Sequence, residues 1–341
     1  MVLGTFCVVC ALVSLAFCTQ FYQFLLAHAL YGIAGTIVYS PATAISGHWF
    51  LKKRSTAVGI IVCGSGLGGV VYPVFLKNLF DRMSFRDSML IIAAFNFALM
   101  LPACIFMKSR LPPRQPPSYK ALAGPLKEAG YTFLVAGSGL YLLNVFTPYF
   151  NAPVLAQSNS LPPNIAQYSV AILQAGSFVG RAAAGVLADY FGVWNVFGTM
   201  LFGSAISVFA FWTPTVGVAP AIVGMVLFGI FSGGWFTLCA AACATISPVT
   251  EIGMRLGMLW TAAGIPILVG PVVAGLLVTA GGDKFTYAGI FCGITFLIAS
   301  LVTLAPRFVP LLKSRADNET DGGESVMSTT TTASPMDEQE K

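Results

Sequence analysis

Arg181 is the residue whose type and position say most about the chemistry of this sequence. It lies within the apolar run 166–188, eight residues before Asp189, which is roughly 12 Å along a helix. A guanidinium inside an apolar helix is unfavourable unless it faces water or a partner, and its planar fork of donors matches a carboxylate. We therefore expect Arg181 to bind the anionic end of a ligand. The alternative is that its long side chain extends to the nearer helix end.

Two more charged residues stand beside apolar runs. Asp189 follows the run 166–188, and Arg255 lies at the start of the run 254–279. A carboxylate there can cap a neighbouring helix or pair with a base such as Arg255 in one conformation. We expect both residues to act in gating, although Arg255 is also explained as a positive charge that anchors its helix.

The composition indicates the environment of these residues. Of 341 residues, 56% are hydrophobic and 9% are charged, whereas about 25% are charged in soluble domains. Seven of the thirteen acids fall in the last 25 residues, so the rest of the chain has too few polar groups to cover a surface in water. The expected environment is therefore the lipid bilayer. The scattered basic residues form no face that would bind nucleic acid.

Ten apolar runs are candidates for membrane spans. Their continuous apolarity, with Gly and Ala but few charges, favours helices over the alternating strands of a barrel. We predict an all-α polytopic membrane protein. The predicted spans are 2–19, 22–47, 55–78, 88–107, 131–153, 166–188, 195–213, 217–245, 254–279 and 285–306.

The sequence also contains an internal repeat. Four landmarks in the first half recur 197 or 198 residues later: Gly32, Gly59, Gly66 and Pro73, which correspond to Gly229, Gly257, Gly264 and Pro271. Repeats of this kind are typical of secondary transporters. The second half begins near Tyr131, so its counterpart would begin about 67 residues before Met1. We therefore expect two further spans upstream of Met1.

Prolines and charges divide the chain into four parts. We predict an N-terminal bundle remnant with four spans at 1–107, a linker at 108–130, a six-helix bundle at 131–312 and a disordered tail at 313–341. Twelve Lys and Arg residues fall in joints on one side of the spans and four on the other. This bias predicts that the linker, the tail and both termini face the cytoplasm, and we expect the plasma membrane.

Three stretches resemble a known family. They are Tyr31-Gly32-x-x-Gly35 followed by Tyr39-Ser40-Pro41 and Trp49-Phe50-x-Lys52-Lys53-Arg54-x-x-Ala57-x-Gly59; Gly180-Arg181-x-x-x-Gly185-x-Leu187-Ala188-Asp189-x-x-Gly192; and Gly270-Pro271-x-x-Ala274-Gly275. Over residues 1–312 the chain is similar to the monocarboxylate-transporter-like branch of the major facilitator superfamily. The resemblance implies a two-bundle transporter of twelve helices for small organic anions, of which this chain supplies helices three to twelve.

The resemblance further implies which helices line a central cavity. On those helices the candidate substrate-binding residues, in addition to Arg181, are Tyr39, Tyr141, Asn144 and Trp235. The plainer explanation for each is an interfacial anchor or a hydrogen bond between helices, as it is for His28, Gln174 and Trp260. In branch members that move protons with the anion, an aspartate lies one turn before the arginine. Here Ser177 occupies that position, so proton coupling stays open.

The expected function is secondary transport of a small organic acid or related metabolite by alternating access. Two alternatives remain: efflux of a secondary metabolite, and a truncated membrane protein that does not transport. The sequence has no H-E-x-x-H, no G-x-S-x-G and no pair of carboxylates within a span. We therefore expect no enzyme activity, no metal and no cofactor.

Overall fold

The computed structural model describes residues 1–50, 53–107, 122–214, 217–248, 251–282 and 285–305. All regular elements in these ranges are helices. They are α1 (Val2–Ala16), α2 (Phe21–Trp49), α3 (Arg54–Phe80), α4 (Phe85–Phe106), the short η2 (Pro125–Lys127), α5 (Ala129–Leu142), α6 (Phe146–Ser158), α7 (Pro163–Ala166), α8 (Ser169–Phe191), α9 (Val193–Ser207), η3 (Val208–Trp212), α10 (Val218–Thr245), α11 (Ile252–Ala280) and α12 (Thr286–Leu304).

The predicted all-α polytopic fold is confirmed. Nine helical stretches among the described residues are long and apolar enough to cross a membrane, and α1 is a shorter apolar helix. Each of the ten predicted spans coincides with one of these stretches or with α1. Most of the predicted linker and all of the predicted tail fall on residues 108–121 and 306–341, which lie outside the described residues.

The span predicted at 131–153 is interrupted between α5 and α6. Residues 143–145 join the two helices, at the point where the α11 backbone approaches most closely. A Cβ built on Gly270 of α11 would fall on the Leu143 carbonyl. Only glycine permits this contact, so the interruption in one span and a glycine in another belong to the same packing feature.

Local chemistry sets two of the turns. Ser84 precedes α4, and its hydroxyl accepts a hydrogen bond from the backbone N–H of Asp87 at 3.2 Å. This satisfies one of the free donors of the first turn. Gly192 alone separates α8 from α9 and has a φ of +85°. That backbone region favours glycine, so the chain can reverse in a single residue.

The helix boundaries follow the repeat. α2 and α10 begin at Phe21 and Val218, 197 residues apart, and α3 and α11 begin at Arg54 and Ile252, 198 apart. The ends of α4 and α12, at Phe106 and Leu304, are also 198 residues apart. The sequence repeat therefore corresponds to equivalent helices in the two halves.

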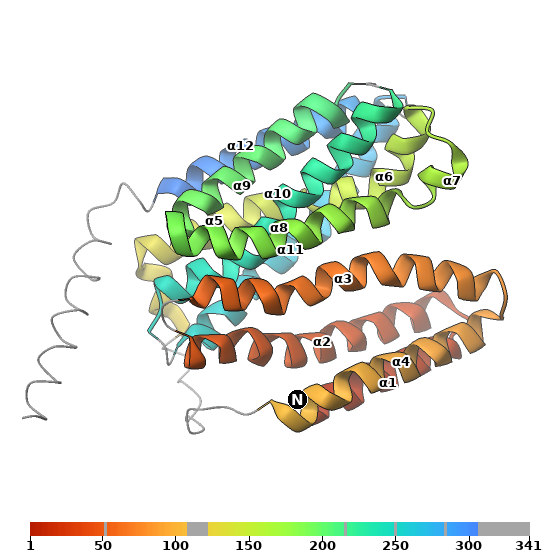
Figure 1. Cartoon of the computed structure of the whole chain (residues 1–341), viewed down its shortest axis with the longest axis horizontal. Helices are drawn as coiled ribbons and strands as arrows, with labels where there is room; N and C mark the ends of the chain where they lie inside the picture. The colour runs from red at the N-terminus through yellow and green to blue at the C-terminus, as the bar shows by residue number, and fades with distance from the viewer. Residues whose placement is uncertain (51–52, 108–121, 215–216, 249–250, 283–284, 306–341) are drawn as a thin grey trace, which may run out of the picture.

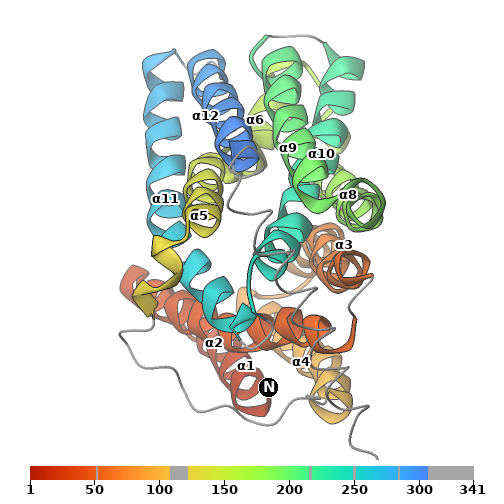
Figure 2. The ribbon, with the colours of Figure 1, turned by 90° about the vertical axis from the view of Figure 1, so that its left-hand side faces the viewer.

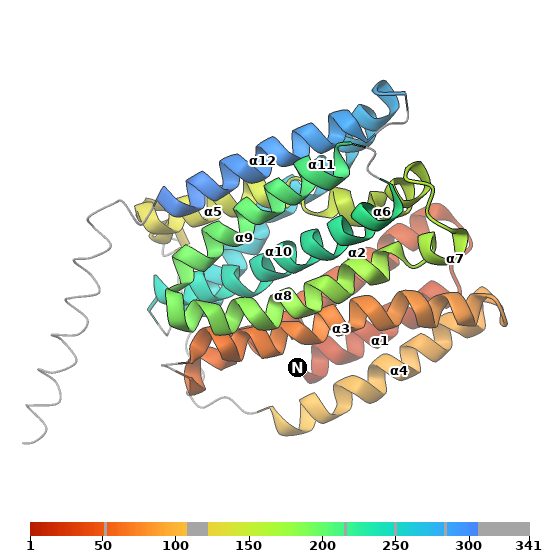
Figure 3. The ribbon, with the colours of Figure 1, turned by 45° about the horizontal axis from the view of Figure 1, so that its top comes forward.

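The helices form two groups that meet along one main seam. We call α1–α4 the N-terminal group and α5–α12 the C-terminal group (Figure 1). One hydrophobic core lies within the N-terminal group, and the larger core of the C-terminal group also includes Val58 and Val62 of α3. Between the groups, α3 packs extensively on α8 and less on α10, while α2 contacts α11. Figure 2 shows α3 beside α8 from the end of the molecule, and Figure 3 shows α4 at the outer edge of the N-terminal group.

Glycines allow the α3–α8 seam to close. A Cβ on Gly66 of α3 would lie 2.8 Å from the Phe178 Cα, and a Cβ on Gly185 of α8 would lie 2.7 Å from the Ser55 carbonyl oxygen. Both distances are too short for a side chain, so the two backbones are in direct contact. We call the end at which α3 begins and α8 ends the Arg54 end; α5 and α11 also begin there (Figure 1).

Candidate functional site

Arg181 lies where α3, α8 and α10 meet, with 5% of its surface exposed. Its Nη1 donates to the Val62 carbonyl at 3.2 Å and to the Ser65 hydroxyl, both on α3. These are the hydrogen bonds that the guanidinium makes to the described residues, and its buried Nε has no acceptor among them. The edge formed by Nε and Nη2 therefore has no acceptor among the described residues. Such an edge can bind a carboxylate through two parallel hydrogen bonds.

The Arg181 guanidinium stays at the depth of the span. Its partners Val62 and Ser65 lie eight and eleven residues after Arg54, the first residue of α3, which is roughly 12–17 Å along the helix axis. An arginine that snorkels would instead turn toward the helix end. In this conformation the Arg181 side chain extends from α8 across the seam and is hydrogen-bonded to the middle of α3, a helix of the N-terminal group.

A chain of aromatic rings leads away from Arg181. The guanidinium carbon lies 4.8 Å from the centre of the Phe236 ring, and the Phe236 and Trp235 rings of α10 are 5.2 Å apart. Trp260 of α11 is 5.7 Å from Trp235 and 6.1 Å from Tyr39 of α2, both edge-on. The structure thus connects Arg181 to the predicted residues Tyr39 and Trp235. Trp260, which the sequence placed only within a span, joins them.

The other two predicted binding residues are buried within the C-terminal group. Tyr141 has no exposed surface, stacks on Trp235 at 5.6 Å and hydrogen-bonds the Ser204 hydroxyl at 2.8 Å. Asn144 is equally buried and donates to the Thr295 hydroxyl at 3.0 Å. In this conformation Tyr141 supports the Trp235 ring, while Asn144 holds the residues between α5 and α6 against α12.

Ser177 belongs to a cluster of buried hydroxyls that the sequence did not reveal. The Tyr149 hydroxyl of α6 donates to Ser177 at 3.3 Å and also hydrogen-bonds Ser232 of α10 at 2.9 Å. The cluster is neutral, and the described acids all lie at helix ends. No set of three His, Cys, Asp or Glu residues in the described ranges could hold a metal ion. Tyr149 gave no sequence signal beyond its place in an apolar span.

Asp189 joins the two groups at the Arg54 end. Its carboxylate accepts hydrogen bonds from the backbone N–H groups of Ser55 at 3.2 Å and Thr56 at 2.9 Å, and from the Thr56 hydroxyl at 2.6 Å. A residue at the end of α8 therefore caps α3, where free donors and the helix dipole favour a negative charge. Nearby, Arg54 Nη1 donates to the Ala244 carbonyl at the end of α10 at 2.9 Å.

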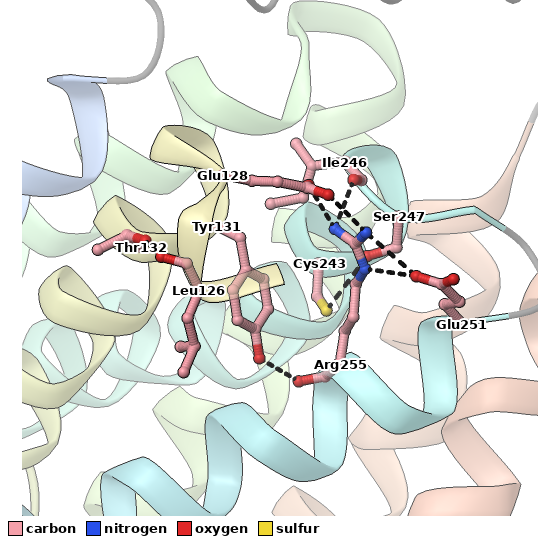
Figure 4. Close-up of polar contacts among 9 residues, drawn as sticks. All are labelled: Leu126, Glu128, Tyr131, Thr132, Cys243, Ile246, Ser247, Glu251 and Arg255. Atoms are coloured by element: carbon pink, nitrogen blue, oxygen red, sulfur yellow. Dashed lines mark hydrogen bonds and ion pairs between the residues drawn. The ribbon is translucent and has the colours of Figure 1, made fainter. Parts of the chain in front are cut away.

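Arg255 is bound within its own group and not to Asp189 (Figure 4). Its Nη1 and Nη2 donate to the two carboxylate oxygens of Glu128 at 2.7 and 2.9 Å, and Nη2 lies 3.1 Å from Glu251. The Tyr131 hydroxyl donates to the Arg255 carbonyl at 2.6 Å. These contacts join the starts of α5 and α11. The sequence is compatible with two arrangements for Asp189, a cap on a neighbouring helix and a pair with Arg255. In this structure Asp189 caps α3.

Comparisons with known proteins identify the family. A model of the Major Facilitator Superfamily matches residues 1–155 and 134–335. The MFS transporter asaE of Aspergillus flavus is 33% identical over 310 residues, which are 90% of this chain and 70% of the relative. The fujikurins efflux protein of Gibberella fujikuroi is 30% identical over 313 residues, 90% of this chain and 66% of that protein. The aspyridones efflux protein apdF of Emericella nidulans is 31% identical over 305 residues, 89% of this chain and 62% of that protein.

Solved structures agree on the fold. The human organic anion transporter MFSD10 (TETRAN) has a TM-score of 0.74 at 15% identity, covering 88% of this chain and 75% of that one. FucP in its outward conformation has a TM-score of 0.71 at 13% identity, covering 89% and 81%. None of these matches bears on the monocarboxylate-transporter-like branch, which stays a prediction. From the family match and the curated relatives, this multi-pass chain belongs to the Major Facilitator Superfamily of membrane transporters.

Proposed function

We propose that this chain exports an organic acid of the secondary-metabolite class by alternating access. The observation that carries the proposal is the Arg181 guanidinium. One nitrogen is fixed on α3, and the Nε–Nη2 edge has no acceptor among the described residues. A buried cation with two donors that have no acceptor is suited to a carboxylate or a similar anion.

The direction of transport is proposed from the relatives. Two of the matched proteins are named for the efflux of fujikurins and of aspyridones. Together with the excess of basic residues on one side of the spans, this supports a plasma-membrane exporter whose Arg54 end faces the cytoplasm. Import of a small monocarboxylate is the alternative, and it shares the same Arg181 site.

The contacts at the Arg54 end supply a gate for this proposal. Asp189 on Ser55 and Thr56, and Arg54 on the Ala244 carbonyl, hold the two groups together there. A substrate that arrives from the cytoplasm requires both contacts to break as the groups rock apart. The neutral Tyr149–Ser177–Ser232 cluster supplies no carboxylate beside Arg181, so the proposal includes no proton relay through these residues.

The test uses Arg181→Lys and Arg181→Ala in the full chain. Lysine keeps the charge but lacks the bidentate fork, so we expect weaker affinity for a labelled aromatic acid such as 2-naphthoate. Alanine should abolish movement of the acid across vesicles but spare the neutral analogue 2-acetylnaphthalene. Rates are normalised to the amount of protein in the membrane.

Two results would contradict the proposal. Wild-type affinity in Arg181→Lys, with acid and neutral analogue equally affected in Arg181→Ala, would assign Arg181 a structural role. Vesicles in which the wild-type chain moves neither compound would favour the non-transporting alternative.

A further inference from the structure

We propose that the substrate is a flat, conjugated anion with a second acceptor oxygen, and that Tyr39, Trp235 and Trp260 bind its ring system. The inference rests on the proposed function, because it describes the part of the ligand that lies beyond the anionic group at Arg181. It assigns a substrate class that the family match does not specify.

The first observation is the continuity of the rings. The Arg181 guanidinium carbon lies 4.8 Å from the centre of the Phe236 ring. From Phe236 the contacts run through Trp235 and Trp260 to Tyr39 at centre-to-centre distances between 5.2 and 6.1 Å. Among the ring pairs of the described residues, Tyr39–Trp260 is the pair that joins the two helical groups. A separation of the groups would open this pair. A flat ring inserted there would recover the aromatic contacts.

The second observation is a set of hydrogen-bond donors without acceptors. The indole Nε1 atoms of Trp235 and Trp260 are buried and have no partner in the described residues, and the same is true of Arg181 Nε. A buried N–H without an acceptor is unfavourable. Three such donors along one chain of rings match a ligand with an anionic group at one end and a carbonyl or enol oxygen further along.

Trp212 and Gln174 each have another buried polar atom without a partner among the described residues, and both atoms lie outside this chain of rings. Trp212 also has a buried Nε1 without an acceptor, but it packs on Phe228 and Phe285 at 5.7 Å, away from Arg181 and α2. The indole alone is therefore not diagnostic. Gln174 Oε1 is also buried without a partner in the described residues, but it is an acceptor and not a donor. It lies in α8 seven residues before Arg181, about 10 Å along the helix, so it does not belong to the set of donors beside the rings. Its amide packs where a Gly69 side chain would stand.

The experiment measures equilibrium binding to membrane vesicles that contain the full chain. The probes are 6-acetyl-2-naphthoate, 6-ethyl-2-naphthoate and 6-ethyldecahydro-2-naphthoate. The first two differ in one acceptor oxygen, and the third keeps the carboxylate on a saturated skeleton. We expect the acetyl compound to bind about fivefold more tightly than the ethyl compound, which is the effect of one hydrogen bond. The saturated acid should bind about tenfold more weakly than the flat acids, because it lacks aromatic contacts.

Conservative variants separate the two interactions. Trp235→Phe and Trp260→Phe keep a ring but remove the N–H, and one of them should abolish the preference for the acetyl compound. Trp260→Leu removes the ring and should abolish the preference for flat acids. Trp212→Phe is the matched control and should leave both preferences intact.

The outcomes distinguish this inference from the proposed function. Equal binding of the three acids by the wild-type chain overturns the inference while leaving Arg181 as an anion site. Preferences that persist in every Trp235 and Trp260 variant also overturn it. Preferences that depend on these tryptophans, together with an unchanged affinity for the three acids in Arg181→Ala, would support the aromatic site and contradict the proposed role of Arg181.

Discussion

α3 and α11 occupy equivalent places in the two halves of the repeat, yet their glycines have different surroundings. In α3, a Cβ on Gly59 would lie 3.0 Å from the Arg181 carbonyl oxygen, and a Cβ on Gly66 would lie 2.8 Å from the Phe178 Cα. In α11, Gly257 and Gly264 stand 198 residues later, and no described atom lies within 4 Å of a Cβ on either. Glycine spacing permits close approach, but the approach itself requires a partner helix.

The beginnings of the two helices differ in a parallel way. The first turn of α3 is capped by Asp189, which belongs to the other group. At the start of α11, Arg255 is held by Glu128 and Glu251 of its own group. Equivalent helices are thus fixed by different means. The start of α3 depends on the contact between the groups, whereas the start of α11 does not.

The largest expected effect tests the glycine comparison directly. Gly66→Leu places a side chain against the α8 backbone and should destabilise the fold by about 3 kcal/mol, as overpacking does. Gly264→Leu, its counterpart on α11, should change stability by less than about 0.5 kcal/mol, because the side chain meets open space. Thermal unfolding of both variants in lipid nanodiscs measures the difference. Equal destabilisation would mean that the α11 face is also in close helix contact in the membrane.

Removal of Arg255 has the next largest expected effect. Arg255→Met leaves Glu128 and Glu251 without their shared partner but partly exposed, with 28% and 34% of their side chains accessible. We expect a loss of about 2 kcal/mol, less than for a fully buried pair. The same unfolding assay measures it, and Lys127→Met in the same segment serves as a control. Unchanged stability would show that the cluster makes no net contribution.

Asp189 has the smallest expected effect on stability but a specific effect on the gate. Asp189→Ala removes the α3 cap and should cost about 1 kcal/mol, which makes opening of the Arg54 end about fivefold more frequent. A cysteine introduced at Ser55, which is 4% exposed, should then react faster with a soluble maleimide, as followed by peptide mass spectrometry.

Two control variants sharpen the Asp189 prediction. Asp189→Asn keeps an acceptor oxygen and should show a smaller increase in labelling. Glu251→Ala, at the start of α11, should show none. A rise in labelling with Glu251→Ala as large as that with Asp189→Ala would contradict the distinction between the two helix starts.

Hydropathy and spacing were sufficient for the order of the helices. Apolar runs located the nine helical stretches of the described residues that are long enough to cross a membrane, and also the shorter α1, because a bilayer demands long apolar segments with internally satisfied backbones. The glycine and proline offsets revealed the repeat, and the starts of α2, α3, α10 and α11 follow the same offsets. The position of Asp189 after an apolar run also suggested a helix cap, since free N–H groups attract a carboxylate.

Contacts between distant helices were decided only by the tertiary structure. Nothing in the sequence indicated that Nη1 of Arg181 binds Val62 and Ser65, that Trp260 meets Tyr39, or that Tyr141 is buried behind Trp235. These helices are apolar on every face, so periodicity does not distinguish the side that meets another helix from the side that meets lipid. The reason is physical: lipid and protein interior are equally apolar, and partners are selected by fit between surfaces.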